Sequence, residues 1–396
     1  MPEPVLSADG HIDLPCLPPT LFTERAPRAL RDRMPRVVNS DKGPRWVAGD
    51  GAPLGIAGGM GSLGRAYEPG QIRRADRMAE TGLYADQARG LLRTSLPELR
   101  LKDQERDGVL GEVIYGILGA AGRVKDDEAA SAMLRIYNDF AHEFQSHAPE
   151  RFAMIGCLPV SSVSSGSSPE HAVAELVRCR ELGLRGVELP IVDGMMPLWR
   201  EEWDPLWAAA ADCGLAVHLH TVGGSFDQRW VERREHYLPF LASVLTGFQM
   251  AMADHIAAVI FGGALERFPA LRIVMGESGL GWIPYVLERM DYEWQDQFRN
   301  LPLSMPPSAY WRRQMLATYQ QDEVGIENLE RIGIENVMWG SDFPHPDGVW
   351  PDSQEHLARQ LGGLAPEVRH KIVFANAARV YGFPAVGASS STQPDA

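Results

Sequence analysis

From about residue 109 onward, short apolar runs alternate with longer segments whose apolar and polar positions follow a helical period. Two of the longer segments, "SPEHAVAELVRCRELG" and "DPLWAAAADCG", end on glycine, as helices commonly do. This alternation is typical of βα units around a parallel sheet. The runs with the length and composition of strands lie at residues 4–11, 112–117, 151–158, 185–189, 215–220, 271–276, 315–320 and 336–341. Eight such strands predict an α/β fold, the TIM (β/α)8 barrel.

Two stretches depart from this pattern. Residues 17–108 follow the first strand and are rich in Pro, Gly and Arg, which predicts an irregular insertion. Because the insertion leaves the barrel at the carboxyl end of a strand, we expect it to cover the barrel mouth. Residues 386–396 are small and polar, which predicts a disordered tail. We therefore expect one domain over residues 1–385.

Two histidines close the fifth predicted strand, in "AVHLHTVGG". Residues i and i+2 of a strand point to the same side, so His218 and His220 face one space. A buried imidazole that donates to a backbone carbonyl is a common alternative to a functional histidine. The pair by itself therefore leaves its role open.

Other strands of the predicted barrel also end in acidic or imidazole side chains. Asp and Glu are seldom buried without a partner, so core packing explains such a set poorly. The carboxyl ends of barrel strands share one face, where carboxylates and imidazoles together suit a metal ion. The set comprises Asp9, His11 and Asp13 after the first strand, His218 and His220 at the fifth, Glu277 at the sixth, and Asp342, His345 and Asp347 after the eighth.

Composition and charge exclude several classes of partner. The chain is 45% hydrophobic and 23% charged, which is ordinary for a soluble enzyme. Its net charge is −14, from 38 basic and 52 acidic residues, and no basic run occurs, so we expect neither nucleic acid nor a membrane as partner. The first residues have no signal-peptide pattern, no segment approaches 18 uninterrupted apolar residues, and the four cysteines form no C-x-x-C pair. These features favour a cytoplasmic protein.

The motifs "ADGH", "HLHT", "GGALERFPALRIVMGESGLGWIPYVLERMD", "MWGSDFPHPDG" and "NAARVYGF" resemble the amidohydrolase-2 branch of the amidohydrolase superfamily. This branch includes amino-carboxymuconate-semialdehyde decarboxylase and γ-resorcylate decarboxylase. The resemblance covers residues 1–14 and about 109–383. It implies a distorted TIM barrel that holds one divalent metal ion, for which we place Zn²⁺ first and Mn²⁺ or Fe²⁺ as alternatives.

The resemblance also implies a ligand set. The family's metal pair on the first strand falls on Asp9 and His11, with Asp13 as the alternative to Asp9. Its remaining ligands fall on His220 and Asp342, which leaves His218 as a neighbour of the metal site.

The sixth-strand position departs from the family pattern, because Glu277 replaces the usual histidine. An ionised Glu can only accept hydrogen bonds. Nearby carboxylates would raise the pKa of Glu277, and the protonated side chain could then act as an acid. Glu277 can thus act as a base or as an acid, or it can pair with an arginine such as Arg289 and only support the barrel rim.

One metal at a barrel mouth suits two reaction classes. We rank non-oxidative decarboxylation of an aromatic or unsaturated carboxylic acid first and metal-dependent hydrolysis second; a non-enzymatic binding or scaffold role ranks below both. We expect a small carboxylic acid as substrate and a homo-oligomeric protein. Glu277 and Asp342 are the expected catalytic residues, and the expected substrate contacts are His218, His345 and Arg229. The alternative for Arg229 and its loop is a solvated helix start.

Overall fold

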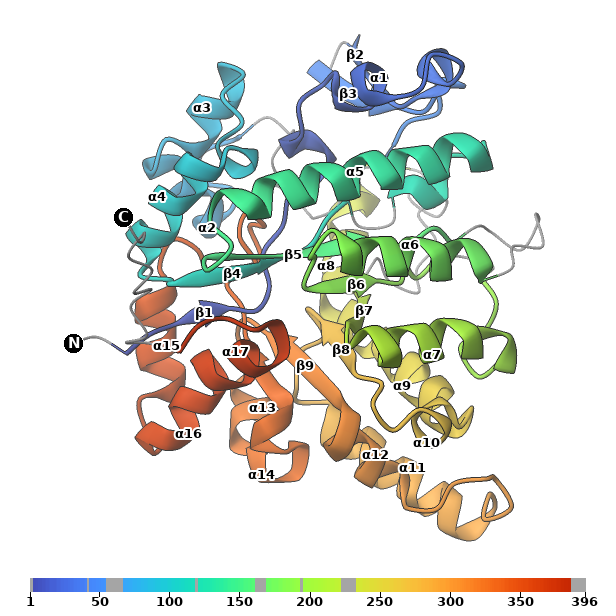
Figure 1. Ribbon diagram of the computed structural model, residues 1–396. Coiled ribbons are helices and arrows are strands. Elements are labelled where there is room, and N and C mark those ends of the chain that lie inside the picture. Colours follow the sequence, from blue (N-terminus) through green and yellow to red (C-terminus); the bar gives the residue numbers. More distant parts are fainter. Residues whose placement is uncertain are drawn as a thin grey trace, which may run out of the picture.

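Eight parallel strands, each hydrogen-bonded to the next, form a nearly closed barrel with helices around it (Figure 1). The computed structural model describes residues 3–40, 43–54, 67–117, 120–160, 169–192, 195–221 and 233–385. The barrel strands are β1 (Leu6–Ser7), β4 (Gly111–Ile114), β5 (Phe152–Cys157), β6 (Gly186–Glu188), β7 (Ala216–His220), β8 (Ile273–Gly276), β9 (Met315–Tyr319) and β10 (Val337–Trp339). Seven of them lie within a predicted run and β4 begins one residue before its run, so the prediction of a TIM-like barrel is confirmed.

Helices follow the barrel strands and cover the outside of the sheet (Figure 1). Local sequence sets their ends: the Asp126 side chain accepts a hydrogen bond from the backbone of Ala129 at the start of α5, and Gly214 adopts φ 66° after α7. The helices are α5 (Asp127–His147), α6 (Glu170–Glu181), α7 (Asp204–Cys213), α8 (Arg234–Gly247), α9 (Met252–Phe261), α10 (Ala264–Arg267), α11 (Ile283–Asp296), α12 (Pro307–Gln314), α13 (Glu323–Glu327), α14 (Leu329–Ile332), α15 (Ser353–Leu361), α16 (Pro366–His370) and α17 (Asn376–Tyr381).

The barrel closes where the segments around β1 and β10 meet. The backbone N–H of Ala8 donates to the carbonyl oxygen of Trp339 at 2.8 Å, and that of Asp342 donates to the carbonyl oxygen of Asp9 at 2.9 Å. A Cβ added at Gly340 would lie 2.4 Å from the Cβ of Asp9, so only glycine permits this approach. The closure brings Asp9 next to Asp342, although 333 positions separate them in the sequence.

The segment between β1 and β4 is more regular than its composition predicts. The expectation of an irregular insertion is wrong for much of it, because helices and a hairpin form there. Pro97 at the first turn and Gly108 at φ 70° bound the longest of these helices. The elements are α1 (Leu21–Arg25), an antiparallel pair β2 (Arg36–Ser40) and β3 (Gly43–Val47), α2 (Arg73–Glu80), α3 (Leu83–Ala88) and α4 (Pro97–Asp107).

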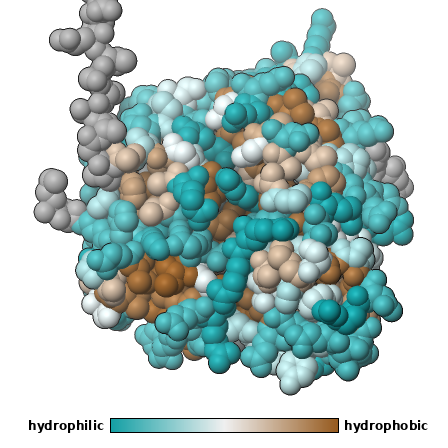
Figure 2. All heavy atoms as spheres, turned by 60° about the horizontal axis from the view of Figure 1, so that its bottom comes forward, coloured by the Kyte–Doolittle hydropathy of each residue, from teal (hydrophilic) through white to brown (hydrophobic). Residues whose placement is uncertain are grey.

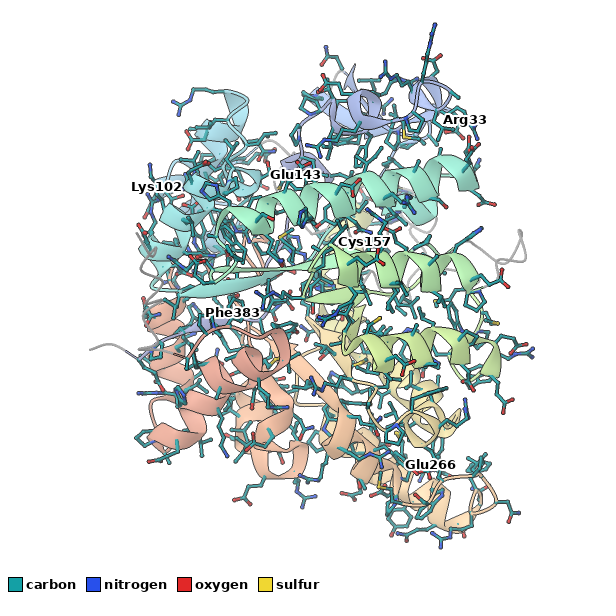
Figure 3. The ribbon with its side chains drawn as sticks, viewed as in Figure 1. Arg33, Lys102, Glu143, Cys157, Glu266 and Phe383 are labelled. Atoms are coloured by element: carbon teal, nitrogen blue, oxygen red, sulfur yellow. The ribbon has the colours of Figure 1, made fainter. Side chains whose placement is uncertain are left out.

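Contacts tie this segment to the barrel at several points. Ser95 donates to the carbonyl oxygen of Cys16, and Arg33 pairs with Asp126 at the start of α5. Figure 3 labels Arg33 where this segment lies next to the start of α5. Arg100 donates to the carbonyl oxygen of His11, four residues after the end of β1. The coverage of the barrel mouth by residues 17–108 stays a prediction, and the tail at 386–396 lies outside the described residues.

Arg100 supports a first prediction, on stability. Its guanidinium group is fully buried, donates to Glu112 at 2.8 Å and to the carbonyl oxygen of His11 at 2.8 Å, and lies 4.6 Å from the centre of the Phe343 ring. Replacing Arg100 by Ala leaves the Glu112 carboxylate buried without its charged partner, with only the hydrogen bond from Gln104 at 2.8 Å. We expect Arg100→Ala to lower the free energy of unfolding by about 3–5 kcal/mol in denaturant titrations.

A matched exposed pair is the control for this change. Arg25 pairs with Glu143 on α5, and the two side chains are 38% and 56% exposed. We expect Arg25→Ala to change the free energy of unfolding by about 0–1 kcal/mol. Equal losses in the two variants would contradict the structural role of Arg100.

The helical run Glu235–Phe261 joins α8 to α9 and is apolar for most of its length. Its length and its mean hydropathy of 1.5 would suffice for a membrane span. Buried helices of soluble proteins meet the same criteria of length and composition. Its α9 part packs against α10, α11 and α12. On the face that Figure 2 shows, hydrophilic residues cover most of the surface and hydrophobic side chains form separate patches. The absence of a membrane partner stays a prediction.

Candidate metal centre

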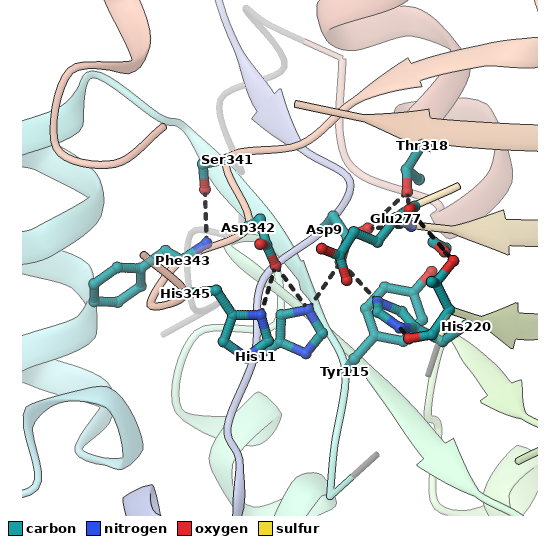
Figure 4. A network of polar contacts seen from close by, with 12 residues as sticks. Asp9, His11, Tyr115, His220, Glu277, Thr318, Ser341, Asp342, Phe343 and His345 are labelled. Atoms are coloured by element: carbon teal, nitrogen blue, oxygen red, sulfur yellow. Dashed lines mark hydrogen bonds and ion pairs between the residues drawn. The ribbon is translucent and has the colours of Figure 1, made fainter. Parts of the chain in front are cut away.

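Three of the four predicted metal ligands converge inside the barrel (Figure 4). Oδ1 of Asp9 lies 3.2 Å from Nε2 of His11 and 3.5 Å from Nε2 of His220. The three residues offer ligand atoms that all lie within 4.8 Å of one another. The period of two in β7 places His220 toward the barrel interior, and the chain after β1 brings Asp9 and His11 to meet it.

The fourth predicted ligand, Asp342, joins this group through His11. Its Oδ1 lies 3.0 Å from Nε2 of His11, and His11, Asp342 and His345 form a second group of possible ligands within 4.8 Å. Asp342 adopts φ 58°, and Glu277 adopts φ 49°; among the described residues these are the only non-glycine positions with positive φ. Such backbone costs about 1–3 kcal/mol and concentrates at functional sites.

Hydrogen bonds hold one side of Asp9 and of His220 and leave the other side free. Oδ2 of Asp9 accepts from the Thr318 hydroxyl at 2.6 Å and from the Glu277 backbone N–H at 2.9 Å. Nδ1 of His220 donates to the carbonyl oxygen of Thr221 at 3.0 Å. A histidine whose Nδ1 carries the proton presents a bare Nε2, which is the form that binds metal.

In the four predicted ligands, the side-chain atoms without a hydrogen-bond partner include the ones that would bind a metal ion. The four side chains are at most 1% exposed, and a buried polar atom without a partner is costly. Two carboxylates and two imidazoles give a mixed oxygen and nitrogen donor set, which suits Zn²⁺, Mn²⁺ or Fe²⁺. In these four side chains the buried atoms without a hydrogen-bond partner are Oδ1 of Asp9, Nδ1 and Nε2 of His11, Nε2 of His220 and Oδ2 of Asp342. The residues present therefore fit a divalent metal ion.

Glu277 lies beside this group without belonging to the Asp9, His11 and His220 set. Burial and the nearby Asp342 carboxylate raise the pKa of Glu277 well above its ordinary value. Glu277, Asp342 and Asp347 form a third acidic group within 4.8 Å, in which only Asp347 is exposed. The alternative pairing with Arg289 is wrong, because Arg289 forms its ion pair with Glu293 on the same helix. The raised pKa favours the protonated form of Glu277, which can donate a proton.

The three expected substrate contacts, His218, His345 and Arg229, differ in their surroundings. His218 lies deeper in the barrel, fully buried, with Nδ1 2.7 Å from the Tyr115 hydroxyl, and burial lowers its pKa to about 3. His345 is 4% exposed and has both ring nitrogens hydrogen-bonded to carboxylates. Arg229 lies outside the described residues. The substrate-binding roles of these three residues stay predictions.

Several residues of the site escaped the sequence analysis. Thr318 on β9 holds Asp9, and the Tyr115 ring lies 4.6 Å from the His220 ring and 5.6 Å from the His11 ring. Glu188 at the end of β6 is buried, which raises its pKa, and the Cys157 thiol donates to it at 3.6 Å. Each is a polar residue near the end of a predicted barrel strand. A search for every polar residue at such positions would have found them.

The fold and the site define a member of a known class of barrel enzymes. The sequence profile of the Amidohydrolase family, of the amidohydrolase-2 branch, matches residues 98–383. The match covers well over half of the chain, so the protein belongs to this family. The resemblance inferred from the motifs is thereby confirmed.

Similar proteins within the family are decarboxylases. A γ-resorcylate decarboxylase of Rhodococcus jostii is 26% identical over 285 residues, which are 66% of this chain and 81% of that protein. A 2-amino-3-carboxymuconate-6-semialdehyde decarboxylase of Dictyostelium discoideum is 25% identical over 291 residues, which are 72% and 76% of the two chains.

A solved structure has a similar fold. It is a mutant of 5-carboxyvanillate decarboxylase from Novosphingobium aromaticivorans, with bound manganese and 3-methoxy-4-hydroxy-5-nitrobenzoic acid. That chain is 20% identical, and the match covers 96% of this protein and 97% of that one with a TM-score of 0.66. At this identity the likeness concerns the fold.

Proposed function

We propose that this protein is a metal-dependent decarboxylase of a small aromatic or unsaturated carboxylic acid. The observation that carries the proposal is a pair of overlapping groups of buried possible ligands, Asp9, His11 and His220 in one and Asp342 with His11 in the other, beside a carboxyl group whose pKa is raised. The decarboxylases among its relatives support the same reaction class.

Asp9, His11, His220 and Asp342 would hold the metal ion. Their donor set suits Zn²⁺, which the sequence analysis places first, and the manganese in the solved relative makes Mn²⁺ the second ion to test. When bound, a divalent ion supplies a Lewis acid for the substrate carboxylate and an adjacent oxygen.

Glu277 would protonate the carbon that bears the carboxylate. The proton forms a new C–H bond with an electron pair of the ring or double bond. The C–C bond to the carboxylate then breaks, its electron pair restores the unsaturated system, and CO₂ leaves. The Glu277 carboxylate regains a proton from water. The reaction thus consumes one proton, releases one CO₂ and requires no redox cofactor.

The environment of Glu277 fits this role. Its backbone N–H donates to Asp9 Oδ2 and to the Thr318 hydroxyl at 2.7 Å, which fixes the residue beside the predicted ligands. Asp342 is suited to be a ligand in its anionic form: burial acts to raise its pKa, but His345 and His11 lower it overall.

The proposal is tested by metal analysis of the purified protein together with a panel of hydroxybenzoates and muconates. We expect about one equivalent of a divalent metal and CO₂ release from at least one acid of the panel, both lost after chelation and restored by Zn²⁺ or Mn²⁺. Hydrolysis of amides and lactones is scored in parallel. Hydrolysis without CO₂ release would favour the hydrolase class, and neither activity in a metal-loaded protein would contradict the proposal.

A further inference from the structure

His345 lies between two carboxylates. Its Nδ1 donates to Oδ1 of Asp342 at 3.0 Å, and its Nε2 donates to Oδ2 of Asp13 at 2.8 Å. Each ring nitrogen of His345 thus faces one carboxylate oxygen. His345 therefore links Asp13 to Asp342.

Asp13 faces a second imidazole with its other oxygen. Oδ1 of Asp13 lies 4.0 Å from Nδ1 of His11, and both atoms are buried without a hydrogen-bond partner. The rings of His11 and His345 stack with their centres 4.2 Å apart. A histidine that binds metal through one nitrogen commonly directs its other N–H at a carboxylate or carbonyl. Asp13 is placed to be that carboxylate for His11.

One carboxylate thus acts on two of the predicted ligands. Asp13 faces His11 directly, and it reaches Asp342 through His345. The Asp342 side chain is contacted only at Oδ1, by Nδ1 of His345 and Nε2 of His11, each at 3.0 Å. The His345 contact is the one of the two that remains when Nε2 of His11 binds a metal, so it helps to fix where the Asp342 carboxylate points.

We propose that Asp13 and His345 are positioning residues that hold His11 and Asp342 in the geometry the metal requires. The inference rests on the proposed metal site and assigns Asp13 a role other than that of an alternative ligand. Asp13 belongs to none of the groups of possible ligands among the described residues. Its hydrogen bond to His345 and its approach to His11 are instead the contacts of a carboxylate that orients ligands.

The test measures metal binding by the full-length protein without reference to activity. After chelation, Mn²⁺ is titrated by calorimetry into the wild type, Asp13→Ala, Asp13→Asn and His345→Gln. We expect Asp13→Ala and His345→Gln to bind Mn²⁺ about 10–100-fold more weakly, the usual effect of losing a residue that orients a ligand. Asp13→Asn keeps an acceptor for His345 and should lie between Asp13→Ala and the wild type. The visible spectrum of the Co²⁺-loaded protein should change in Asp13→Ala, because the ligand geometry changes.

Asp107→Asn is the matched control. Asp107 is a 2% exposed carboxylate that accepts hydrogen bonds from the backbone and the hydroxyl of Ser353, away from the predicted ligands. We expect this variant to lose stability while it keeps the Mn²⁺ affinity and the Co²⁺ spectrum. In the double variant Asp13→Ala with His345→Gln, the loss should be smaller than the product of the single losses, because the two residues act in one chain.

The outcomes separate this inference from the proposed function. A wild type that binds no Mn²⁺, Zn²⁺ or Co²⁺ contradicts the metal site itself. A wild type that binds Mn²⁺, together with unchanged affinity and spectrum in Asp13→Ala, overturns the positioning roles. If Asp13→Ala fails to fold, unchanged Mn²⁺ affinity in both Asp13→Asn and His345→Gln also overturns the positioning roles.

Discussion

The His220→Ala variant is expected to lose its metal and its activity while it keeps the fold. Nε2 of His220 is a buried atom without a hydrogen-bond partner, and it faces Oδ1 of Asp9 at 3.5 Å. Removing it takes one of four donors from the proposed site, whereas the β7 backbone keeps its pairing. Metal content measured by plasma emission should fall well below one equivalent, and CO₂ release should fall by at least about 10²-fold.

His218→Ala is the control on the same strand. His218 is also fully buried, but its Nδ1 is bonded to the Tyr115 hydroxyl, and it belongs to none of the groups of possible ligands among the described residues. We expect this variant to keep its metal content. Full metal occupancy in a folded His220→Ala protein would show that the ligand set is wrong.

The second large effect is expected for Glu277→Gln. Gln keeps the shape and the hydrogen-bonding capacity of the side chain but has no proton to give to carbon. Turnover should fall by roughly 10²-fold or more, the usual scale for a lost general acid, while metal content stays near that of the wild type. Unchanged turnover, or loss of metal from the variant, would mean that Glu277 has another role.

The pH dependence gives an independent readout of the same role. Burial and Asp342 raise the pKa of Glu277 well above its ordinary value, so the protonated form persists to a higher pH than in an exposed Glu. An acid catalyst must be protonated, and turnover by the wild type should therefore fall as the pH rises through this raised pKa. In Glu277→Gln that decline should be absent from the remaining activity, because the titrating group is gone. A decline that persists unchanged would assign it to another group.

The periodicity of the chain predicted the barrel and the positions of the four expected ligands. Strand residues alternate between two faces, and the carboxyl ends of parallel strands meet at one face of a barrel. Periodicity alone placed nine acidic and imidazole side chains at this face, and the family resemblance singled out Asp9, His11, His220 and Asp342 among them. The helices between residues 17 and 108 were missed, because a composition rich in Pro, Gly and Arg obscures the short helical periods there.

Only the tertiary structure decided which side chains pair with which. Arg289 is bonded to Glu293 instead of Glu277, and Thr318 reaches Asp9 across 309 positions of the sequence. His345, expected from the sequence as a substrate contact, reaches back across 332 positions to Asp13 and so links two carboxylates. Periodicity determines the face on which a residue lies, because it depends only on the local backbone. Pairing across the barrel depends on closure and on side-chain rotation, which the local sequence does not determine.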